Sequence, residues 1–314
     1  MSTPSQVASS SSLSGSLLSA RKVRWGERIA KALLQFAAAF SIAITAGIVV
    51  ALAMPSIEFF RSVPVLDFLT GTRWAPRFAN ATFGVVPLIT ATLWTTAIAL
   101  SVAVPVGLGA AIFLSEYARP GVRKVLKPLL ELLAGVPTVV YGLFALQFVQ
   151  STLIKEWLGW ETGAFSVLAA GLVMGVMIVP TIASISEDAM SAVPLSLRQG
   201  SAALGANRMQ TTLRVVIPAA VSGIAAAIVL GISRAVGETM IVALAAGNQA
   251  TIVTGPLQQG QTMTGFIANA ALGDSRVGSL EYDTLFAVGL LLFLITLTIN
   301  FISIKIVRRV REAY

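Results

Sequence analysis

The chain has 314 residues, of which 56% are hydrophobic and only 11% are charged, and its formal net charge is +8. Soluble domains carry about 25% charged residues, so this composition excludes a soluble globular protein and indicates a polytopic membrane protein. The absence of Cys and His excludes disulfides, thiolate metal sites and imidazole proton shuttles.

Residues 1–28 form a Ser-rich, basic stretch. Its low complexity predicts a disordered N-terminal segment on the cytoplasmic side. The apolar run after Arg28 is too long for the hydrophobic core of a cleavable signal peptide. We therefore predict one membrane domain over residues 29–314.

Six apolar runs are each about 20 residues or longer, which is enough to cross the hydrocarbon core of a bilayer. They are approximately residues 30–54, 83–114, 129–149, 165–185, 217–246 and 284–306. Gly135-Val136-Pro137 interrupts the third run and Pro180-Thr181 lies in the fourth. Each is either a helix break near a transport pathway or an ordinary kink.

The distribution of basic residues predicts the orientation. With the N-terminus inside, 16 of the 22 Lys and Arg residues fall in inside segments, five fall in outside loops and Arg234 lies within a span. Cytoplasmic loops of membrane proteins carry this excess of positive charge. Both termini and the segment of about 186–216 are therefore predicted to lie in the cytoplasm of a bacterial cell, as parts of a multi-pass inner-membrane protein.

The fifth predicted span carries the candidate substrate residues Arg234, Glu238 and Thr239. Arg234 and Glu238 are four residues apart, a spacing that predicts one shared helix face. Ionised residues in a span are costly and usually functional. The planar guanidinium suits an oxyanion such as phosphate. Glu238 is predicted to hold Arg234 in place, to neutralise Arg234 when no anion is present, or to accept a proton from a protonated oxyanion. The alternative is a structural ion pair between helices.

Two polar stretches flank this span. Glu187-Asp188 precede the segment 193–218, in which apolar residues alternate with basic and hydroxyl residues, as on an amphipathic helix. The acidic pair is predicted to be solvated, with Arg198 as an alternative partner. In the outer loop, Gly247-Asn248-Gln249 and Thr262-Met263-Thr264 form either a docking face for an external partner or a mobile connector.

Nine residues separate Gly205 from Val215-Val216-Ile217-Pro218. This spacing resembles the EAA loop of ABC importer permeases, whose pattern is Glu-Ala-Ala, three residues, Gly, nine residues and Ile-x-Leu-Pro. Here Gln199-Gly200-Ser201 replaces Glu-Ala-Ala, Val215 replaces Ile and Ile217 replaces Leu.

Further segments are similar to the C-type permease subunit of bacterial phosphate-specific ABC transporters, from the third to the sixth run. They are Asp188-Ala189, Ala192-Val193-Pro194, Leu197-Arg198-Gln199-Gly200-Ser201, Ala203-Leu204-Gly205-Ala206, Arg234-Ala235-Val236-Gly237-Glu238-Thr239-Met240, Gly247-Asn248 and Thr262-Met263-Thr264. The resemblance implies an all-α membrane protein with six transmembrane helices in the MetI-like importer-permease architecture.

The same resemblance implies a permease that translocates phosphate without a cofactor of its own. Its partners would be an A-type permease subunit in a pseudo-twofold heterodimer, two ATP-binding subunits and a periplasmic phosphate-binding protein. ATP would be bound and hydrolysed by the partner subunit, in agreement with the lack of a Walker A pattern in this sequence. A coupling helix of about 198–209 would enter the ATPase. The coupling residues would be Arg198, Gln199, Gly200, Ser201, Ala203, Leu204, Gly205, Ala206 and Arg208.

Three alternatives remain at this stage. The first is the same architecture with another oxyanion, such as sulfate or molybdate. The second is an ion-coupled secondary carrier that works alone, which the scarcity of carboxylates within the spans disfavours. The third is a membrane-embedded enzyme, which is disfavoured because the sequence has no His, no Cys and no clustered carboxylates for catalysis.

Overall fold

The computed structural model describes residues 25–78 and 80–311, with side chains as far as Lys305. Of the residues predicted to be disordered (1–28), 1–24 lie outside the described residues, whereas 25–28 form the first turn of helix α1 (Trp25–Ser62), so the prediction is wrong for these four. Contacts divide the chain into two compact units, residues 1–50 and 51–314. Helix α1 begins in the first unit, where large apolar side chains such as Leu34 and Phe36 are exposed. Such a surface is what a bilayer accommodates.

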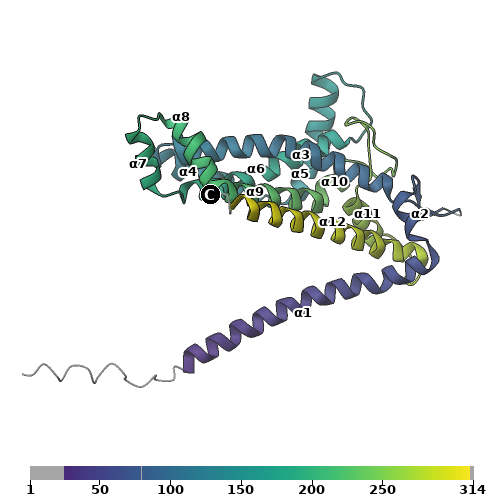
Figure 1. Ribbon diagram of the computed structural model, residues 1–314. Coiled ribbons are helices and arrows are strands. Elements are labelled where there is room, and N and C mark those ends of the chain that lie inside the picture. Colours follow the sequence, from purple (N-terminus) through teal and green to yellow (C-terminus); the bar gives the residue numbers. More distant parts are fainter. Residues whose placement is uncertain (1–24, 79, 312–314) are drawn as a thin grey trace, which may run out of the picture. The chain divides into compact units, whose positions relative to one another are not determined.

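The described part of the chain is mostly helical (Figure 1). After α1 come α2 (Val65–Thr70), the strands β1 (Trp74–Ala75) and β2 (Thr82–Phe83), α3 (Val86–Ile112), the π-helix η1 (Phe113–Tyr117), α4 (Pro120–Ala134), α5 (Thr138–Phe144), the π-helix η2 (Ala145–Trp157), α6 (Val167–Ser191), α7 (Leu195–Ala203), α8 (Arg208–Thr211), the π-helix η3 (Thr212–Val216), α9 (Ile217–Gly237), α10 (Met240–Ala245), α11 (Met263–Ala271) and α12 (Leu280–Arg311). The strands pair antiparallel, Trp74 with Phe83.

Five helical stretches of the described residues are long and apolar enough to cross a membrane: Gly26–Ser62, Val86–Tyr117, Val167–Ser191, Arg208–Gly237 and Leu280–Lys305. The number rises to six when α4 and the α5–η2 stretch count as one span, although the two are bent by 86° at their junction. The prediction of an all-α membrane protein is thus confirmed, with five candidate spans, or six when the bent pair counts as one.

The third predicted span, 129–149, is displaced in the structure. Residues 129–134 belong to α4, which has a basic face, an apolar face and no buried residue. Helix α4 ends at Ala134, and the chain turns at Gly135-Val136-Pro137 before α5 begins. Pro137 cannot continue a helical hydrogen-bond ladder, so the break is real rather than a kink. The helical stretch after it, α5 followed by η2, continues to Trp157, beyond the predicted end at residue 149.

Helices α3 and α6 approach closely because glycines of α6 face α3. A Cβ added at Gly175 would lie 2.8 Å from the Ala99 carbonyl oxygen and 2.9 Å from Val102 Cβ. Gly171 meets Ile98 in the same way, one turn earlier. Small residues at such contacts let two membrane helices pack backbone to backbone. Pro180 lies inside α6, which continues through it to Ser191.

The variant Gly175→Val is expected to destabilise unit 2 by about 1–3 kcal/mol, because overpacking forces α3 and α6 apart. Val176→Leu is the matched control, since Val176 points away from this contact and is 52% exposed. The thermal midpoint of the detergent-solubilised protein should fall for Gly175→Val and stay within error of the parent for the control. Equal midpoints for Gly175→Val and the parent would contradict the close contact.

The segment 247–262 is attached to α3 by side chains of that helix. The Trp94 indole nitrogen donates to the Val253 carbonyl over 3.0 Å, and the Thr92 hydroxyl accepts from the Met263 amide over 3.0 Å. Thr262, Met263 and Thr264 are buried, and Thr262 caps the N-terminus of α11. The prediction of a docking face or mobile connector is therefore wrong for 262–264. The sequence analysis missed α11 because its small, mixed residues carry no clear helical period.

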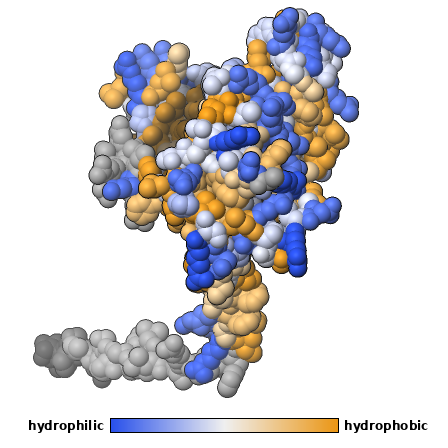
Figure 2. Space-filling model, turned by 90° about the vertical axis from the view of Figure 1, so that its right-hand side faces the viewer, coloured by the Kyte–Doolittle hydropathy of each residue, from blue (hydrophilic) through white to orange (hydrophobic). Residues whose placement is uncertain are grey.

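Figure 1 shows α7 and α8 at one end of unit 2, and α2 and α11 toward the opposite end. Viewed onto this second end, Figure 2 shows hydrophilic residues interspersed with hydrophobic patches. An aromatic cluster supports the same end, where Phe59, Phe68 and Trp74 pack edge to face with their neighbours. The spans between the two ends carry Arg234 and Glu238.

Candidate functional site

The candidate substrate residues lie at a break between α9 and α10. Helix α9 ends at Gly237, and Glu238 is extended, with φ −66° and ψ 133°. Glu238 is 8% exposed. Its Oε1 accepts hydrogen bonds from the amides of Met240 (3.1 Å) and Ile241 (3.3 Å) at the start of α10. The buried carboxylate is therefore held by backbone N–H groups, as in a helix cap.

Arg234 lies in the last turn of α9 and is half-buried. Its Nη1 donates to the Thr181 hydroxyl of α6 over 3.2 Å. Within the described part of the chain, no carboxylate lies within ion-pair distance of Arg234. A guanidinium has five N–H donors in a planar fork, so most of them have no protein acceptor among the described residues.

The predicted shared face of Arg234 and Glu238 is wrong, because the helix ends between these residues. The extended backbone at Glu238 directs its carboxylate to α10 and leaves Arg234 without an acidic partner. Thr239 is the N-cap residue of α10, and its hydroxyl donates to the Gly237 carbonyl over 3.3 Å. The structure thus brings all three residues to one break, but not as an ion pair. Thr181 is the contact that the sequence analysis missed.

The two helix breaks are neighbours in space. Gly142 lies one turn into α5, and a Cβ added there would be 3.2 Å from the Met240 carbonyl oxygen and 2.7 Å from Leu244 Cδ1 of α10. The Tyr141 hydroxyl donates to the Leu133 carbonyl across the α4–α5 break over 2.8 Å. Irregular backbone at membrane depth is tolerated where it is buried in protein or lines a polar cavity. The helices that follow the two breaks, α5 and α10, thus pack against each other, and Arg234 lies in the last turn before the second break.

The predicted coupling helix of about 198–209 is two helices. Helix α7 ends at Ala203, and Gly205 adopts φ +81°, a left-handed conformation that favours glycine. Asn207 and Gln210 then form a reciprocal capping box that begins α8. The single-helix prediction is wrong because it treated Gly205 as a helical residue.

Several predicted coupling residues have partners within the chain. Arg198 Nη1 donates to both carboxylate oxygens of Glu116 (2.6 Å each), and its Nη2 donates to the Met190 carbonyl over 2.7 Å. Arg208 lies over the Tyr117 ring at 5.5 Å from the centroid. The hydroxyls of Ser201 and Thr211 are 2.9 Å apart and join α7 to α8. The alternative pairing of Arg198 with Glu187 or Asp188 is wrong.

The free surface of α7 and α8 is partly apolar. Leu204 is 91% exposed, and Leu195, Leu197, Met209 and Leu213 are also exposed. A hollow of about 710 Å³ lies beside them, and Gly200, Gly205 and Ala206 help to line it. Gln199 and Ala203 are exposed as well. Exposed apolar patches of this kind mark protein contact sites.

Glu187 is fully buried, so the prediction of a solvated acidic pair is wrong for this residue. Its carboxylate forms ion pairs with Arg123 and, over 2.7 Å, with Lys127, both from α4. Asp188 is exposed and pairs with Lys127. The amphipathic helix α4 is thereby fastened to the end of α6. The sequence gave no sign of this pairing, because the basic residues of α4 and the acidic residues of α6 are about 60 positions apart.

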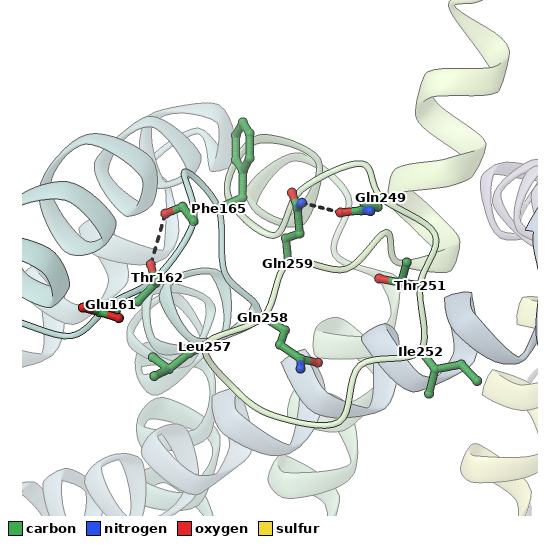
Figure 3. A pocket seen from close by; sticks show the side chains of 10 residues that line it. Glu161, Thr162, Phe165, Gln249, Thr251, Ile252, Leu257, Gln258 and Gln259 are labelled. Carbon is green, nitrogen blue, oxygen red and sulfur yellow. Dashed lines mark hydrogen bonds between the residues drawn. The ribbon is translucent and has the colours of Figure 1, made fainter.

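At the opposite end, a hollow of about 820 Å³ opens between the segment 161–165 and the loop 249–259 (Figure 3). Amide side chains from the loop line it, and the Gln259 amide donates to Gln249. Glu161 is its one charged lining residue. Asn248 and Gln249 are exposed. For these two residues the docking face therefore stays a prediction. The described residues contain no group of three or more acidic side chains that could hold a metal ion.

A family profile described as "Binding-protein-dependent transport system inner membrane component" matches residues 103–312. The probable ABC transporter permease protein YqgH of Bacillus subtilis is 38% identical over 93% of this chain and 96% of its own length. The phosphate transport system permease protein PstC of Mesorhizobium japonicum is 34% identical, with 78% and 79% covered. PstC 1 of Mycobacterium tuberculosis is 36% identical, with 78% and 82% covered.

Solved structures share the fold at lower identity. A chain in the crystal structure of a bacterial alginate ABC transporter in complex with its periplasmic protein aligns with a TM-score of 0.63 at 17% identity, over 91% of this chain and 98% of the other. The MetNI methionine ABC transporter, in inward-facing conformations, gives a TM-score of 0.56 at 21% identity, over 71% and 96%. The MetI-like architecture implied by the sequence is confirmed. The chain therefore belongs to the binding-protein-dependent transport system inner membrane components, the permease subunits of ABC importers.

Proposed function

We propose that this chain is the permease subunit that conducts inorganic phosphate across the bacterial inner membrane, driven by ATP hydrolysis in a separate subunit. The observation that carries the proposal is the guanidinium of Arg234, which lies beside the α9–α10 break and has N–H donors without an acceptor among the described residues. Charge-assisted bonds from such a fork suit a tetrahedral oxyanion. The curated relatives named phosphate transport system permeases support phosphate as that anion.

The site as proposed comprises Arg234, Thr239 and the Glu238 backbone. Glu238 acts by fixing the break and by keeping its negative charge away from the anion path, rather than by neutralising Arg234. Thr181 orients the guanidinium from α6. Binding through one Arg and one hydroxyl is weak enough for release, which transport requires.

The partners belong to the same proposal. The chain pairs with an A-type permease, and a periplasmic binding protein delivers phosphate at the end that carries α11. Two ATP-binding subunits bind at the opposite end, on helices α7 and α8 of the predicted cytoplasmic coupling loop (residues of about 186–216). Both termini are cytoplasmic, as the positive charge near α4, α7 and α12 supports. The chain needs no cofactor and performs no catalysis, because ATP is hydrolysed by the partner.

Competition between oxyanions tests the substrate. In proteoliposomes that contain the whole complex, ATP and the binding protein, sulfate or molybdate at 100-fold excess is expected to leave radiolabelled phosphate uptake within about twofold of its value, because a site tuned to one anion discriminates by several kcal/mol. Competition by sulfate at concentrations equal to phosphate would overturn the substrate assignment. Uptake without ATP would favour the secondary carrier instead.

A further inference from the structure

The end of α3 holds both helices of the coupling loop through two consecutive residues. Glu116 and Tyr117 lie in η1, the π-helix that follows α3. The Glu116 side chain is 6% exposed, and Arg198 of α7 is 20% exposed. Tyr117 carries the Arg208 guanidinium of α8 on its ring. The contacts therefore fall on either side of the left-handed turn at Gly205.

Both oxygens of the Glu116 carboxylate are hydrogen-bonded. Both carboxylate oxygens accept from the same Arg198 nitrogen over 2.6 Å, and the Ser115 hydroxyl donates to Oε1 over 2.8 Å. The second Arg198 nitrogen donates to Met190 at the end of α6. A buried ion pair holds its partners firmly only when its remaining donors and acceptors are satisfied, and removal of one partner leaves an uncompensated buried charge. Arg198 thus fastens α7 to α3 and α6 together.

We infer that Glu116 and Tyr117 are positioning residues that clamp the coupling loop, so that α7, α8, α3 and α6 move as one body when the ATP-binding subunits close. This inference rests on the proposed function. The two arginines are fasteners inside the chain. The ATPase then contacts the exposed apolar surface around Leu204. Motion enters the membrane through the close α3–α6 pair, in addition to the direct connection from the loop into α9.

The replacement of Glu-Ala-Ala by Gln199-Gly200-Ser201 fits this arrangement. Gln199 and Gly200 are exposed, and an added Cβ at Gly200 would meet nothing within 4 Å. Ser201 instead bonds to Thr211 across the turn. Internal polar contacts at Ser201, Arg198 and Arg208 therefore hold the loop in shape without an acidic residue at position 199.

The test uses the whole complex in nanodiscs with Glu116→Gln, which removes the charge at nearly constant volume. Amide hydrogen exchange is measured in peptides that cover α7, and phosphate imported per ATP hydrolysed is measured in proteoliposomes. Exchange in α7 is expected to speed up about tenfold, because the segment opens locally once its anchor is lost. The transport ratio is expected to fall about tenfold. Glu131→Gln, an exposed carboxylate on α4, is the matched control and should change neither.

Three further variants distinguish loss of the clamp from misfolding if Glu116→Gln folds poorly. The reciprocal swap Glu116→Arg with Arg198→Glu should restore at least half of the lost transport ratio, which a merely damaged fold would not do. Tyr117→Phe keeps the ring and should match the parent, whereas Tyr117→Leu should lower the ratio about two- to threefold, since the cation–π contact is lost.

The following results would overturn the clamp or the proposed function. Parent-like exchange of α7 in Glu116→Gln would show that the ion pair does not hold the loop and would overturn the inference. Faster exchange with a parent-like transport ratio would also overturn it, because the held loop would then carry no motion. A parent complex that fails to import phosphate would overturn the proposed function, while the exchange result would still report on the clamp.

Discussion

Phosphate uptake by a complex that carries Arg234→Ala is expected to fall about 100-fold, with the complex still assembled. The guanidinium supplies charge-assisted hydrogen bonds at a poorly solvated position, and their loss is equivalent to about 3 kcal/mol. Arg234 makes only one hydrogen bond within the described chain, to Thr181, and no ion pair there. Its removal therefore strands no buried carboxylate and should cost little stability. Initial rates of radiolabelled phosphate uptake provide the measurement.

The control for Arg234→Ala is Arg234→Lys, which keeps the charge but loses the planar fork. We expect it to retain uptake about tenfold above the alanine variant, since an ammonium binds phosphate as a point charge. Size-exclusion chromatography of both complexes checks assembly. Parent-like uptake by Arg234→Ala would return Arg234 to a structural role between α9 and α6.

Gly205→Asp is expected to weaken binding of the ATP-binding subunits about 100-fold and to abolish ATP-driven uptake. The backbone at Gly205 has φ +81°, where a side chain costs about 1–2 kcal/mol. Under the proposed interface the new carboxylate would also be desolvated without a partner, which costs several kcal/mol more. Pull-down of the ATP-binding subunits at graded concentrations measures the affinity.

Two variants at the same position separate strain from charge. Gly205→Ala adds only the backbone strain, and Gly205→Asn is neutral and tolerates a left-handed conformation better than other residues. We expect affinity to decrease in the order glycine, asparagine, alanine and aspartate. Normal affinity and coupling in Gly205→Asp would exclude this turn from the ATPase interface.

The sequence predicted the spans better than their interruptions. Apolar length alone located α3, α6 and α12 within a few residues, because hydrocarbon thickness imposes that length. The breaks at Gly135–Pro137 and at Glu238 depend on backbone conformation, which hydropathy does not report. Pro137 was a visible signal for the first. Glu238 gave no signal for the break between α9 and α10, because a carboxylate four residues after an arginine is equally typical of a continuous helix.

The sequence identified residues of the candidate site but not the contacts that these residues make. Arg234 was identifiable because a charge in a span is costly. Its neighbour Thr181 and the separation of Glu238 from it follow from the packing of α6, α9 and α10, which no local pattern encodes. Arg198 was likewise identified with the wrong partner, since Glu116 is 82 residues away in the sequence. Long-range ion pairs of this kind need the fold before they can be assigned.

Helix α3 has contacts of functional interest at both ends: Thr92 and Trp94 hold the loop 247–262, and Glu116 just beyond the helix holds α7. These residues are more than six turns apart, about 35 Å along a helix. If the external binding protein and the internal ATP-binding subunits both displace α3 when they bind, the affinities of the chain for these two partners are thermodynamically linked. Each ligand must then alter the other's affinity by the same factor. A docked binding protein would thus tighten or loosen the ATP-binding subunits reciprocally, with no side chain shared between the two interfaces.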